Sequence, residues 1–238
     1  LSQFRKRGHE FKQKYTEFVE GIISRGEAEL VPQSELESRE GWFLPHHGVY
    51  HKKTGKIRVV FDCSAQTNGV NLNDQLLQGP DLNNSLLGVL LRFRQKPIAV
   101  SCDIEKMYHR FRVIDEHRDF LRFFWLDEKG NPAVYRMCVH IFGARSSPNC
   151  AKYGLNKLAS DHGENYPQAQ AFIQRNIYVD DGLCSVDTCD EAVNLLNQTR
   201  SLCERGNLRV HKLLSNQAQV LDPFRQEAPN LILHKNVK

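Results

Sequence analysis

The chain has 238 residues, enough to bury one good core or two lobes that share an interface. Hydrophobic residues make up 40% of it and charged residues 25%, a globular composition, and no stretch approaches the roughly 18 apolar residues of a membrane span. The formal net charge of +4 fits a polyanionic partner, but it is too common among other proteins to identify one.

The cysteines and methionines indicate the context of the chain. The seven cysteines never form a CxxC pair and are odd in number, which favours a reducing compartment, with buried thiols, over a disulfide framework. The two methionines are Met107 and Met137, whereas residue 1 is Leu. We therefore expect a fragment or a segment of a polyprotein, and its basic N-terminus does not resemble a signal peptide.

The first forty residues are expected to begin with a helix. Apolar side chains recur between residues 2 and 26 at helical spacing, which gathers them on one stripe. We interpret this stripe as a packing surface, with a partner-binding helix as the alternative; its members are Phe4, Phe11, Tyr15, Phe18 and Ile22. Pro32 and the polar run 33–41 are expected to end the element.

The next segment changes from strand to loop to helix. Residues 42–62 are rich in β-forming residues around a turn at Thr54-Gly55, which predicts two strands. Residues 63–84 are crowded with Asn, Gly, Gln and Asp, a composition typical of a surface loop. Helical spacing resumes over residues 86–93, and Pro97 stops it.

The second half of the chain has clearer signals. A short buried strand over residues 98–102 is predicted to end at Asp103. Residues 121–126 and 133–139 are predicted to be strands joined by a turn. Ser147-Pro148 is typical of a helix start, with Ser as the N-cap and Pro at the first helical position.

The last predicted elements complete a sheet. Residues 173–186 are expected to form a second hairpin with Asp180-Asp181 near its tip. A capping box at residues 188–191 opens a helix that runs to Gly206, and a strand follows at residues 208–210. This order predicts an α+β fold, with an antiparallel sheet and helices packed on one of its faces.

Three aspartates could perform chemistry together. Asp103 closes one apolar strand, and Asp180 and Asp181 are adjacent at a hairpin tip, where their like charges repel. Two adjacent aspartates in a turn usually serve only to form the turn. Here a third aspartate, at the end of an upstream strand, favours a metal site instead. Two Mg²⁺ ions clamped by such carboxylates would suit nucleotide transfer, since Mg²⁺ prefers oxygen ligands.

Five stretches resemble the conserved motifs of reverse transcriptases, in the family's order. Tyr178-Val179-Asp180-Asp181 resembles the palm motif called C, Asp103 to Tyr108 resembles motif A, and Phe142 to Pro148 resembles motif B. Arg58 to Asp62 resembles the fingers strand whose arginine meets the triphosphate, and the stretch from Gly206 to Lys212 is similar to the later glycine-to-lysine stretch. Each motif by itself is weak evidence for the resemblance, whereas all five in the family's order are strong evidence for it.

Several short stretches of the sequence most resemble the reverse transcriptases of the Pao, or BEL, group of long-terminal-repeat retroelements. The matching stretches are Pro45 to Val49, Arg58 to Asp62 followed by Ser64, Asn71 to Asp74, Gly79-Pro80 and Ser215-Asn216. The resemblance implies the fingers and palm of a right-hand polymerase. Its expected parts are a helical lead-in at 1–41, fingers at 42–97 and 113–140, a palm strand with motif A at 98–112, the palm with motifs B, C and D at 141–222, and a tail toward a missing thumb at 223–238.

The resemblance also implies roles for the acidic residues and their neighbours. Asp103 and Asp180 would bind both Mg²⁺ ions, and Mn²⁺ could replace Mg²⁺. Asp181 would be a weaker ligand, and the backbone carbonyl of Ile104 would be a further ligand. Tyr108 would exclude a 2′-hydroxyl by its bulk, with a core position as the alternative. Glu105 would support the site or be merely exposed.

Further residues would bind the nucleotide. Arg58, together with Lys52 or Lys53, would hold the β- and γ-phosphates; Arg58 could instead pair with Asp62. Gly143 would let backbone approach the nucleotide or template. Lys212 would donate a proton to pyrophosphate, or would simply be solvated.

Two other features of the sequence concern possible ligand contacts. Phe142 stands where many retroviral enzymes have Gln, so a polar contact with the nucleotide is absent or replaced by packing. His46, His47 and His51 lack cysteine or carboxylate partners at ligand spacing, so no zinc site is expected there.

The expected function is RNA-directed DNA polymerisation, a phosphoryl transfer from a deoxynucleoside triphosphate to a primer end. The expected partners are an RNA or DNA template with its primer, deoxynucleoside triphosphates, and the thumb, ribonuclease H and integrase domains of the same polyprotein. No membrane association is expected. The expected location is a retroelement particle in the cytoplasm. The alternatives are an inactive nucleic-acid-binding remnant, an RNA-dependent RNA polymerase, which Tyr108 disfavours, and a two-metal nuclease, which does not account for Arg58.

Overall fold

The computed structural model describes residues 2–38, 40–51 and 55–227 of the chain. The chain divides into two compact units. Unit 1 comprises Leu1–Gln78 and Phe111–Ser147, and unit 2 comprises Gly79–Arg110 and Pro148–Lys238. Residues 79–97, expected in the first part of the fingers, belong to unit 2 in the structure. Among the described residues, no helix is long and apolar enough to cross a lipid bilayer.

The predicted N-terminal helix is present in unit 1. Helix α1 (Ser2–Ser24) is interrupted at Gly8, whose φ of 81° is not helical. Phe11, Tyr15 and Ile22 are buried in the hydrophobic core of the unit. The apolar stripe of this helix is therefore a packing surface, as interpreted from the sequence.

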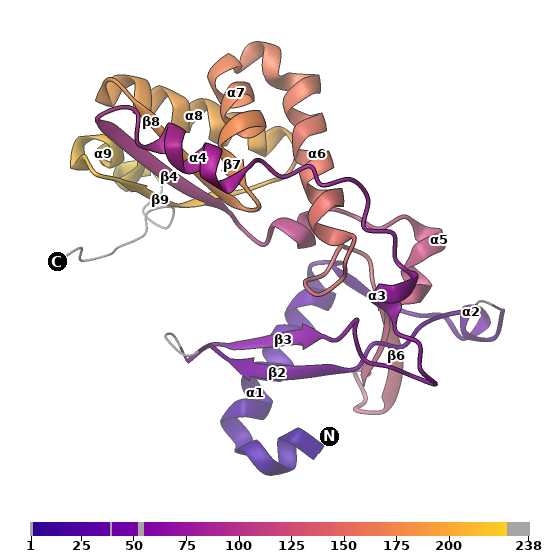
Figure 1. Ribbon diagram of the computed structural model, residues 1–238. Coiled ribbons are helices and arrows are strands. Elements are labelled where there is room, and N and C mark those ends of the chain that lie inside the picture. Colours follow the sequence, from indigo (N-terminus) through magenta and orange to yellow (C-terminus); the bar gives the residue numbers. More distant parts are fainter. Residues whose placement is uncertain (1, 39, 52–54, 228–238) are drawn as a thin grey trace. The chain divides into compact units, whose positions relative to one another are not determined.

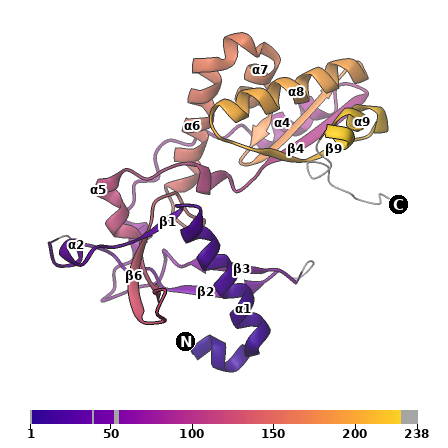
Figure 2. The ribbon, with the colours of Figure 1, turned by 180° about the vertical axis from the view of Figure 1, so that it is seen from behind.

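Antiparallel pairing organises the strands of unit 1 (Figures 1 and 2). Strand β2 (His46–Tyr50) pairs with β3 (Ile57–Phe61), and a second sheet has the order β1-β6-β5. Its members are β1 (Ala28–Leu30), β6 (Pro132–Met137) and β5 (Arg122–Leu126), and β5 with β6 is the predicted hairpin. Strand β1 and helix α2 (Gln33–Ser38) lie where the sequence indicated only a polar connection.

Short helical turns connect these strands. They are α3 (Leu72–Gln75), α5 (Asp115–Arg118) and a 3₁₀ turn over Asp119–Leu121. Helix α3 interrupts the predicted loop at residues 63–84, because Asn71 caps it by accepting a hydrogen bond from the Asp74 backbone N–H.

A buried ion network ties α2 to the β1-β6-β5 sheet. Asp119 accepts from Arg122 Nε at 2.9 Å and from Arg136 Nη1 at 3.2 Å, and all three side chains are almost fully buried. Arg136 also contacts Glu29 on β1 at 2.7 Å and Glu35 on α2 at 2.5 Å. These charges are tolerated in the interior because each has partners of the opposite sign.

Unit 2 contains a four-stranded antiparallel sheet of order β7-β8-β4-β9. Its strands are β7 (Ile177–Tyr178), β8 (Asp181–Val186), β4 (Ile98–Ile104) and β9 (Val210–Ser215). Strand β4 confirms the predicted strand that carries Asp103. The strand expected at residues 208–210 in fact begins at Val210.

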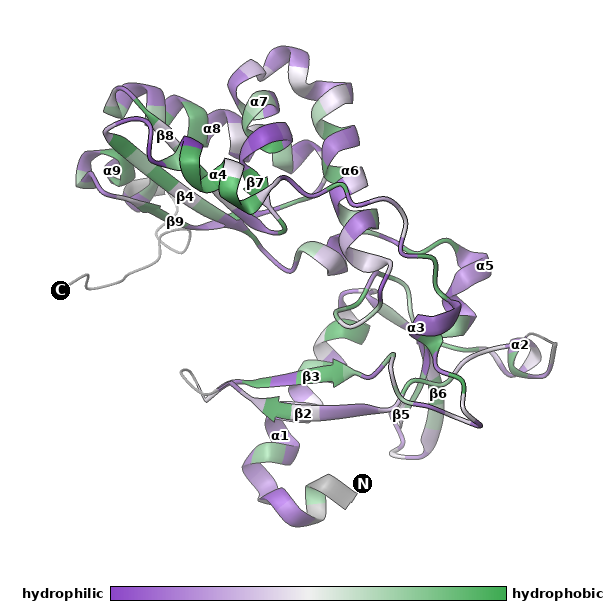
Figure 3. Ribbon diagram, viewed as in Figure 1, coloured by the Kyte–Doolittle hydropathy of each residue, from purple (hydrophilic) through white to green (hydrophobic). Residues whose placement is uncertain are grey.

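Helices pack beside this sheet, as the ribbon shows from both sides (Figures 1 and 2). They are α4 (Leu86–Phe93), α7 (Pro167–Asn176), α8 (Cys189–Arg205) and α9 (Ala218–Glu227). Helix α6 (Ser147–His162) and 3₁₀ turns at Met107–Arg110 and Gly163–Asn165 complete the helical elements of this part of the chain. The predicted helices at residues 86–93, from 147 and from 188 to 206 are confirmed, and Figure 3 shows α4 as largely hydrophobic. The α+β class with antiparallel sheets is thereby confirmed.

The predicted hairpin over residues 173–186 is correct only from residue 177 onward. Residues 173–176 are the last turn of α7. The buried residues Ala169, Phe172, Ile173 and Asn176 have the spacing i, i+3, i+4, i+7 of one helical face, and Pro167 stands at the helix start. This periodicity extends helix α7 up to the residue before β7.

Candidate active site

The three candidate aspartates meet at one end of the unit 2 sheet. Asp103 on β4 and Asp181 on β8 are direct partners in the antiparallel register. The backbone N–H of Ile104 donates to the carbonyl of Asp180 at 3.1 Å, which joins the tip of the β7-β8 hairpin to β4. Because directly opposed residues of antiparallel strands point to the same face, Asp103 and Asp181 share a face of the sheet.

The hairpin tip has a constrained backbone. Tyr178 pairs with Asp181, so Val179 and Asp180 form the two-residue turn between them. Val179 has a φ of 58°, which is unusual for a β-branched residue and indicates local strain. Backbone strain of this kind is found at functional sites, where surrounding contacts hold it in place.

Side chains from other elements hold the hairpin in position. The carbonyl of Ile177 accepts from Asn84 Nδ2 at 2.8 Å and from Lys152 Nζ at 3.5 Å. Lys152, on α6, also donates to the carbonyl of Ile173 at 3.2 Å. Its side chain is 1% exposed, and burial lowers its pKa to about 8. Neither residue was singled out in the sequence, because their contacts are with backbone far along the chain.

Gly182 follows the acidic pair for a steric reason. A Cβ at this position would lie 2.5 Å from Phe172 Cζ and 2.9 Å from Cys102 Sγ. Gly182 and Cys102 therefore point toward α7, and their neighbours Asp181 and Asp103 point to the opposite face, since side chains alternate along a strand. Sequence reasoning missed Gly182, although a glycine inside a strand signals close approach.

The carboxylates of the hairpin tip perturb one another. Burial raises the pKa of Asp180, and the carboxylate of Asp103 raises it further, while Lys212 and His211 act in the opposite direction. The pKa of Asp181 is raised by burial and then by Asp180 and Asp103. Like charges held this close are the arrangement that a cation relieves.

Lys212 lies against the acidic cluster. Its Nζ contacts Asp103 Oδ2, and His211 Nε2 lies 3.3 Å from Asp103 Oδ1. Lys212 therefore pairs with Asp103, and its side chain is half exposed. Glu105, the other uncertain acid, pairs with Arg209 at 3.2 Å.

The structure does not present a finished metal site. Among the described residues, no three His, Cys, Asp or Glu side chains are placed to hold one ion together. The donor set still fits a hard cation, because it offers oxygen ligands at rigid strand ends, and repulsion between neighbouring carboxylates raises the pKa of Asp180 and of Asp181. A cation held by Asp103 would share its carboxylate with Lys212 or displace it.

Tyr108 lies near the acids. It is in the 3₁₀ turn Met107–Arg110 and is 8% exposed. Its pKa is raised by burial and by the charge of Asp180. Tyr108 is therefore both a buried residue and a neighbour of the candidate site. The side chain of Ile104 is buried, so only its backbone is available to a ligand.

The other predicted nucleotide-binding residues belong to unit 1. Arg58 is exposed on β3, and within the described residues its side chain has no hydrogen bond or ion pair, so pairing with Asp62 is not observed. Lys52 and Lys53 lie outside the described residues. Phe142 is 53% exposed.

Gly143 has a structural requirement within unit 1. Its φ is 102°, and a Cβ would lie 3.0 Å from the carbonyl oxygen of Phe61. Asn73 clamps this turn: its Nδ2 donates to the carbonyl of Gly143 at 2.9 Å, and its Oδ1 accepts from the backbone N–H of Arg145 at 2.9 Å. In the sequence, Asn73 stood out only within a stretch that resembles the Pao group. Its structural role could not be predicted, because Gly143 is 70 residues away along the chain.

Among the three histidines near β2, His46 has a packing role. Its Nε2 donates to the carbonyl of Phe124 at 2.9 Å, and its Nδ1 lies 2.5 Å from the hydroxyl of Tyr15. Burial lowers its pKa, which favours the neutral ring.

Comparisons with known proteins place the fold. No protein-family model and no curated protein sequence matches the chain. Among solved structures, a foamy viral protease–reverse transcriptase in complex with double-stranded DNA is similar at a TM-score of 0.65 and 16% identity, over 85% of this chain and 31% of that one.

Two structures of the prototype foamy virus protease–reverse transcriptase agree with it. The selenomethionine-labelled CSH mutant matches at a TM-score of 0.66 and the native protein at 0.65, both at 16% identity. They cover 87% and 88% of this chain, which spans only 24% and 25% of theirs. The chain therefore has the fold of the fingers and palm of a reverse transcriptase.

Proposed function

We propose that this chain is the fingers and palm part of an RNA-directed DNA polymerase of a retroelement. The observation that carries the proposal is the register pairing of Asp103 with Asp181, joined to Asp180 through Ile104 N–H, in a chain with a reverse-transcriptase fold. Nucleotide transfer needs acidic ligands on rigid neighbouring strands, because small displacements of the reacting groups are costly in rate.

In the proposed reaction, the primer 3′-hydroxyl oxygen attacks the α-phosphorus of a deoxynucleoside triphosphate. A bond forms between these atoms, the bond from the α-phosphorus to the bridging oxygen breaks, pyrophosphate leaves, and the proton of the hydroxyl passes to solvent. Two Mg²⁺ ions, or Mn²⁺ in their place, would supply activation of the hydroxyl and neutralisation of the phosphates. Asp103 and Asp180 would hold them, with Asp181 and the Ile104 carbonyl as further ligands.

The remaining residues have positioning roles in this proposal. Lys212, released from Asp103, would donate a proton to pyrophosphate. Tyr108 would exclude a 2′-hydroxyl by its bulk, and Arg58, with Lys53, would hold the β- and γ-phosphates. Gly143 would allow backbone to approach the nucleotide, and Phe142 would provide packing where other enzymes use a glutamine.

The proposed context follows from the subgroup resemblance. We assign the chain to the Pao group, as a segment of a polyprotein that also supplies a thumb, ribonuclease H and integrase, in cytoplasmic particles. The template and primer would be gripped mainly through phosphates, so binding should weaken steeply with salt. The similar foamy viral protein was solved with double-stranded DNA, which supports a nucleic-acid partner.

Primer extension tests the proposal. Asp180→Asn keeps the size of the side chain and removes its charge, so extension of a primed template by the full polyprotein polymerase should be abolished. Asp190→Asn makes the same change at an exposed position in the first turn of α8, and should extend primers like the wild type. Wild-type extension by Asp180→Asn would refute the assigned role.

Two observations favour a second candidate, an inactive nucleic-acid-binding remnant. Asp103 is already neutralised by Lys212, and the described acidic side chains do not form a preassembled ligand set. A remnant would retain salt-sensitive binding of primed template but show no extension with Mg²⁺ or Mn²⁺.

A further inference from the structure

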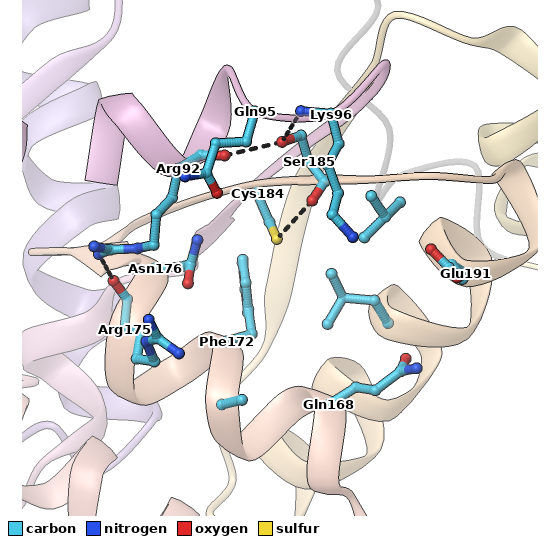
Figure 4. A pocket seen from close by; sticks show the side chains of 13 residues that line it. Arg92, Gln95, Lys96, Gln168, Phe172, Arg175, Asn176, Cys184, Ser185 and Glu191 are labelled. Carbon is cyan, nitrogen blue, oxygen red and sulfur yellow. Dashed lines mark hydrogen bonds between the residues drawn. The ribbon is translucent and has the colours of Figure 1, made fainter. Parts of the chain in front are cut away.

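Unit 2 contains a pocket that the proposed polymerase reaction does not use. Its volume is about 450 Å³, within the range of small-molecule sites. The wall is built from α4 and the residues after it, from α7, from β8 and from the start of α8 (Figure 4). The ligand-facing residues of interest are Arg92, Arg175, Asn176, Phe172, Cys184 and Glu191.

The pocket lies on the face of the sheet opposite to the acidic cluster. Gly182 faces Phe172 on α7, and Cys184, two residues further along β8, points to the same side. Asp181 points to the other side. A ligand in this pocket would therefore be separate from the primer end and the triphosphate.

Two arginines mark one end of the pocket. Arg92 Nη2 contacts the backbone carbonyl of Arg175, as the dashed line in Figure 4 shows. The Nε of Arg92 is buried and has no hydrogen-bond partner among the described residues. The guanidinium of Arg175 is exposed and likewise has no partner within the described part of the chain. The two guanidinium groups make this end of the pocket positively charged, so it favours an anionic ligand.

The other charges near the pocket are already engaged. Lys96 Nζ contacts Asp187 Oδ2 at 2.5 Å, and Glu191 Oε2 accepts from the backbone N–H of Asp187 at 3.0 Å. Figure 4 shows Glu191 on the side away from Arg92 and Arg175. An anion is therefore directed to the arginine end and repelled from the Glu191 end.

The rest of the wall suits an uncharged organic group. Phe172 and Leu195 contribute apolar surface, and Gln95 and Gln168 contribute amides. We propose that this pocket binds a phosphate monoester with a flat organic body, the chemical class of nucleoside monophosphates. The phosphate lies against the arginines, where guanidinium groups bind phosphate oxygens in pairs, and the body lies toward Leu195.

Cys184 provides a direct probe of occupancy. Its thiol lines the pocket and is partly exposed, whereas Cys150 on α6 is exposed outside it and serves as an internal control. The full chain is alkylated with a maleimide in EDTA, and the labelling rate at each cysteine is followed by mass spectrometry with dAMP, deoxyadenosine or inorganic phosphate present. EDTA suppresses nucleotide binding at the acidic cluster.

We expect dAMP to slow labelling of Cys184 at least threefold and leave that of Cys150 unchanged. Deoxyadenosine and phosphate should each need about tenfold higher concentrations for the same protection. Absence of protection by dAMP, or equal protection by either fragment, overturns the proposal. The Asp180→Asn variant should be protected like the wild type, so a failed polymerase assignment and a failed pocket assignment are distinguishable.

Variants identify the phosphate end. Arg175→Gln should raise the half-protecting dAMP concentration about tenfold, equivalent to about 1.4 kcal/mol, and Arg175→Lys should have a smaller effect. Arg94→Gln removes the same charge from an exposed residue just after α4 and outside the pocket wall, and should behave like the wild type. Unchanged protection in Arg175→Gln with an unchanged Tm contradicts the assignment.

Discussion

The ammonium of Lys212 on β9 contacts the carboxylate of Asp103 on the neighbouring strand β4. The two residues are 109 positions apart, and both belong to unit 2. Lys212 thus occupies the carboxylate that the proposed reaction assigns to a metal ion. In the proposed reaction, a metal ion and Lys212 would compete for the carboxylate of Asp103.

This competition gives the first prediction. Replacing Lys212 by Met removes the competing charge, so divalent cations should bind more tightly. Because the side chain of Lys212 is 49% exposed, the pair is worth at most about 1 kcal/mol, and the gain in affinity should be up to about fivefold. Titration of the full chain with Mn²⁺, following free Mn²⁺ by electron paramagnetic resonance, measures it.

The same variant should lose polymerase activity, by roughly 10²-fold if Lys212 is the proton donor. Lys157→Met is the matched control, since Lys157 forms an exposed pair with Asp161 at 2.5 Å on α6. It should change neither Mn²⁺ binding nor extension. Weaker Mn²⁺ binding in Lys212→Met would show that Lys212 does not oppose the ion.

Gly182→Ala should destabilise unit 2. The new methyl group would lie 2.5 Å from Phe172 Cζ and 2.9 Å from Cys102 Sγ, so β8 or α7 must shift. Overpacking of this kind costs about 1–3 kcal/mol. Chemical unfolding followed by far-ultraviolet circular dichroism should show the loss.

A second substitution tests the cause. Phe172→Leu makes room beside Gly182, so the double variant should recover part of the stability lost in Gly182→Ala, and the two effects should be non-additive. Strictly additive losses would mean that Phe172 is not what excludes a side chain at position 182.

The acidic residues could be identified from the sequence because their signals are local. Asp180 and Asp181 follow Tyr178 and Val179 without a gap, and Asp103 ends an apolar strand. Their meeting follows from the pairing of β4 with β8. Local patterns also located α4 and α8, since each has a helical repeat and α8 has a Thr188 cap that accepts from Glu191 N–H.

Contacts set by strand register could not be predicted in this way. Lys212 reaches Asp103 only because β9 pairs with β4 through a register shift between Ser101 and Asp103, and the predicted strand ended at residue 210, two residues before Lys212. Helix α7 was missed for a different reason: its apolar residues run directly into those of β7, so the helical and strand patterns merge near residue 176.

Two half-buried histidines, His46 and His140, should make unit 1 sensitive to mild acid. Burial lowers the pKa of His46, with a partly opposing effect of the Phe124 carbonyl, and burial also lowers the pKa of His140. Below the ordinary histidine pKa of about 6.5, the unfolded chain gains protons that the folded chain resists. The free energy of unfolding should therefore be fully present above that pH and fall as the pH drops below it toward 5.5.

His46→Gln tests this dependence. The variant should lose about 1–2 kcal/mol at pH 7.5, because the contacts with Tyr15 and Phe124 are disturbed, but it should lose less additional stability than the wild type between pH 7.5 and 5.5. Urea unfolding followed by tryptophan fluorescence reports this directly, since Trp42 and Trp125 both pack against the core of unit 1. His9→Gln, at an exposed position of α1, is the control and should keep the wild-type pH dependence. If the pH dependence of His46→Gln were the same as that of the wild type, His46 would not be its cause, and the acid sensitivity would be assigned to His140.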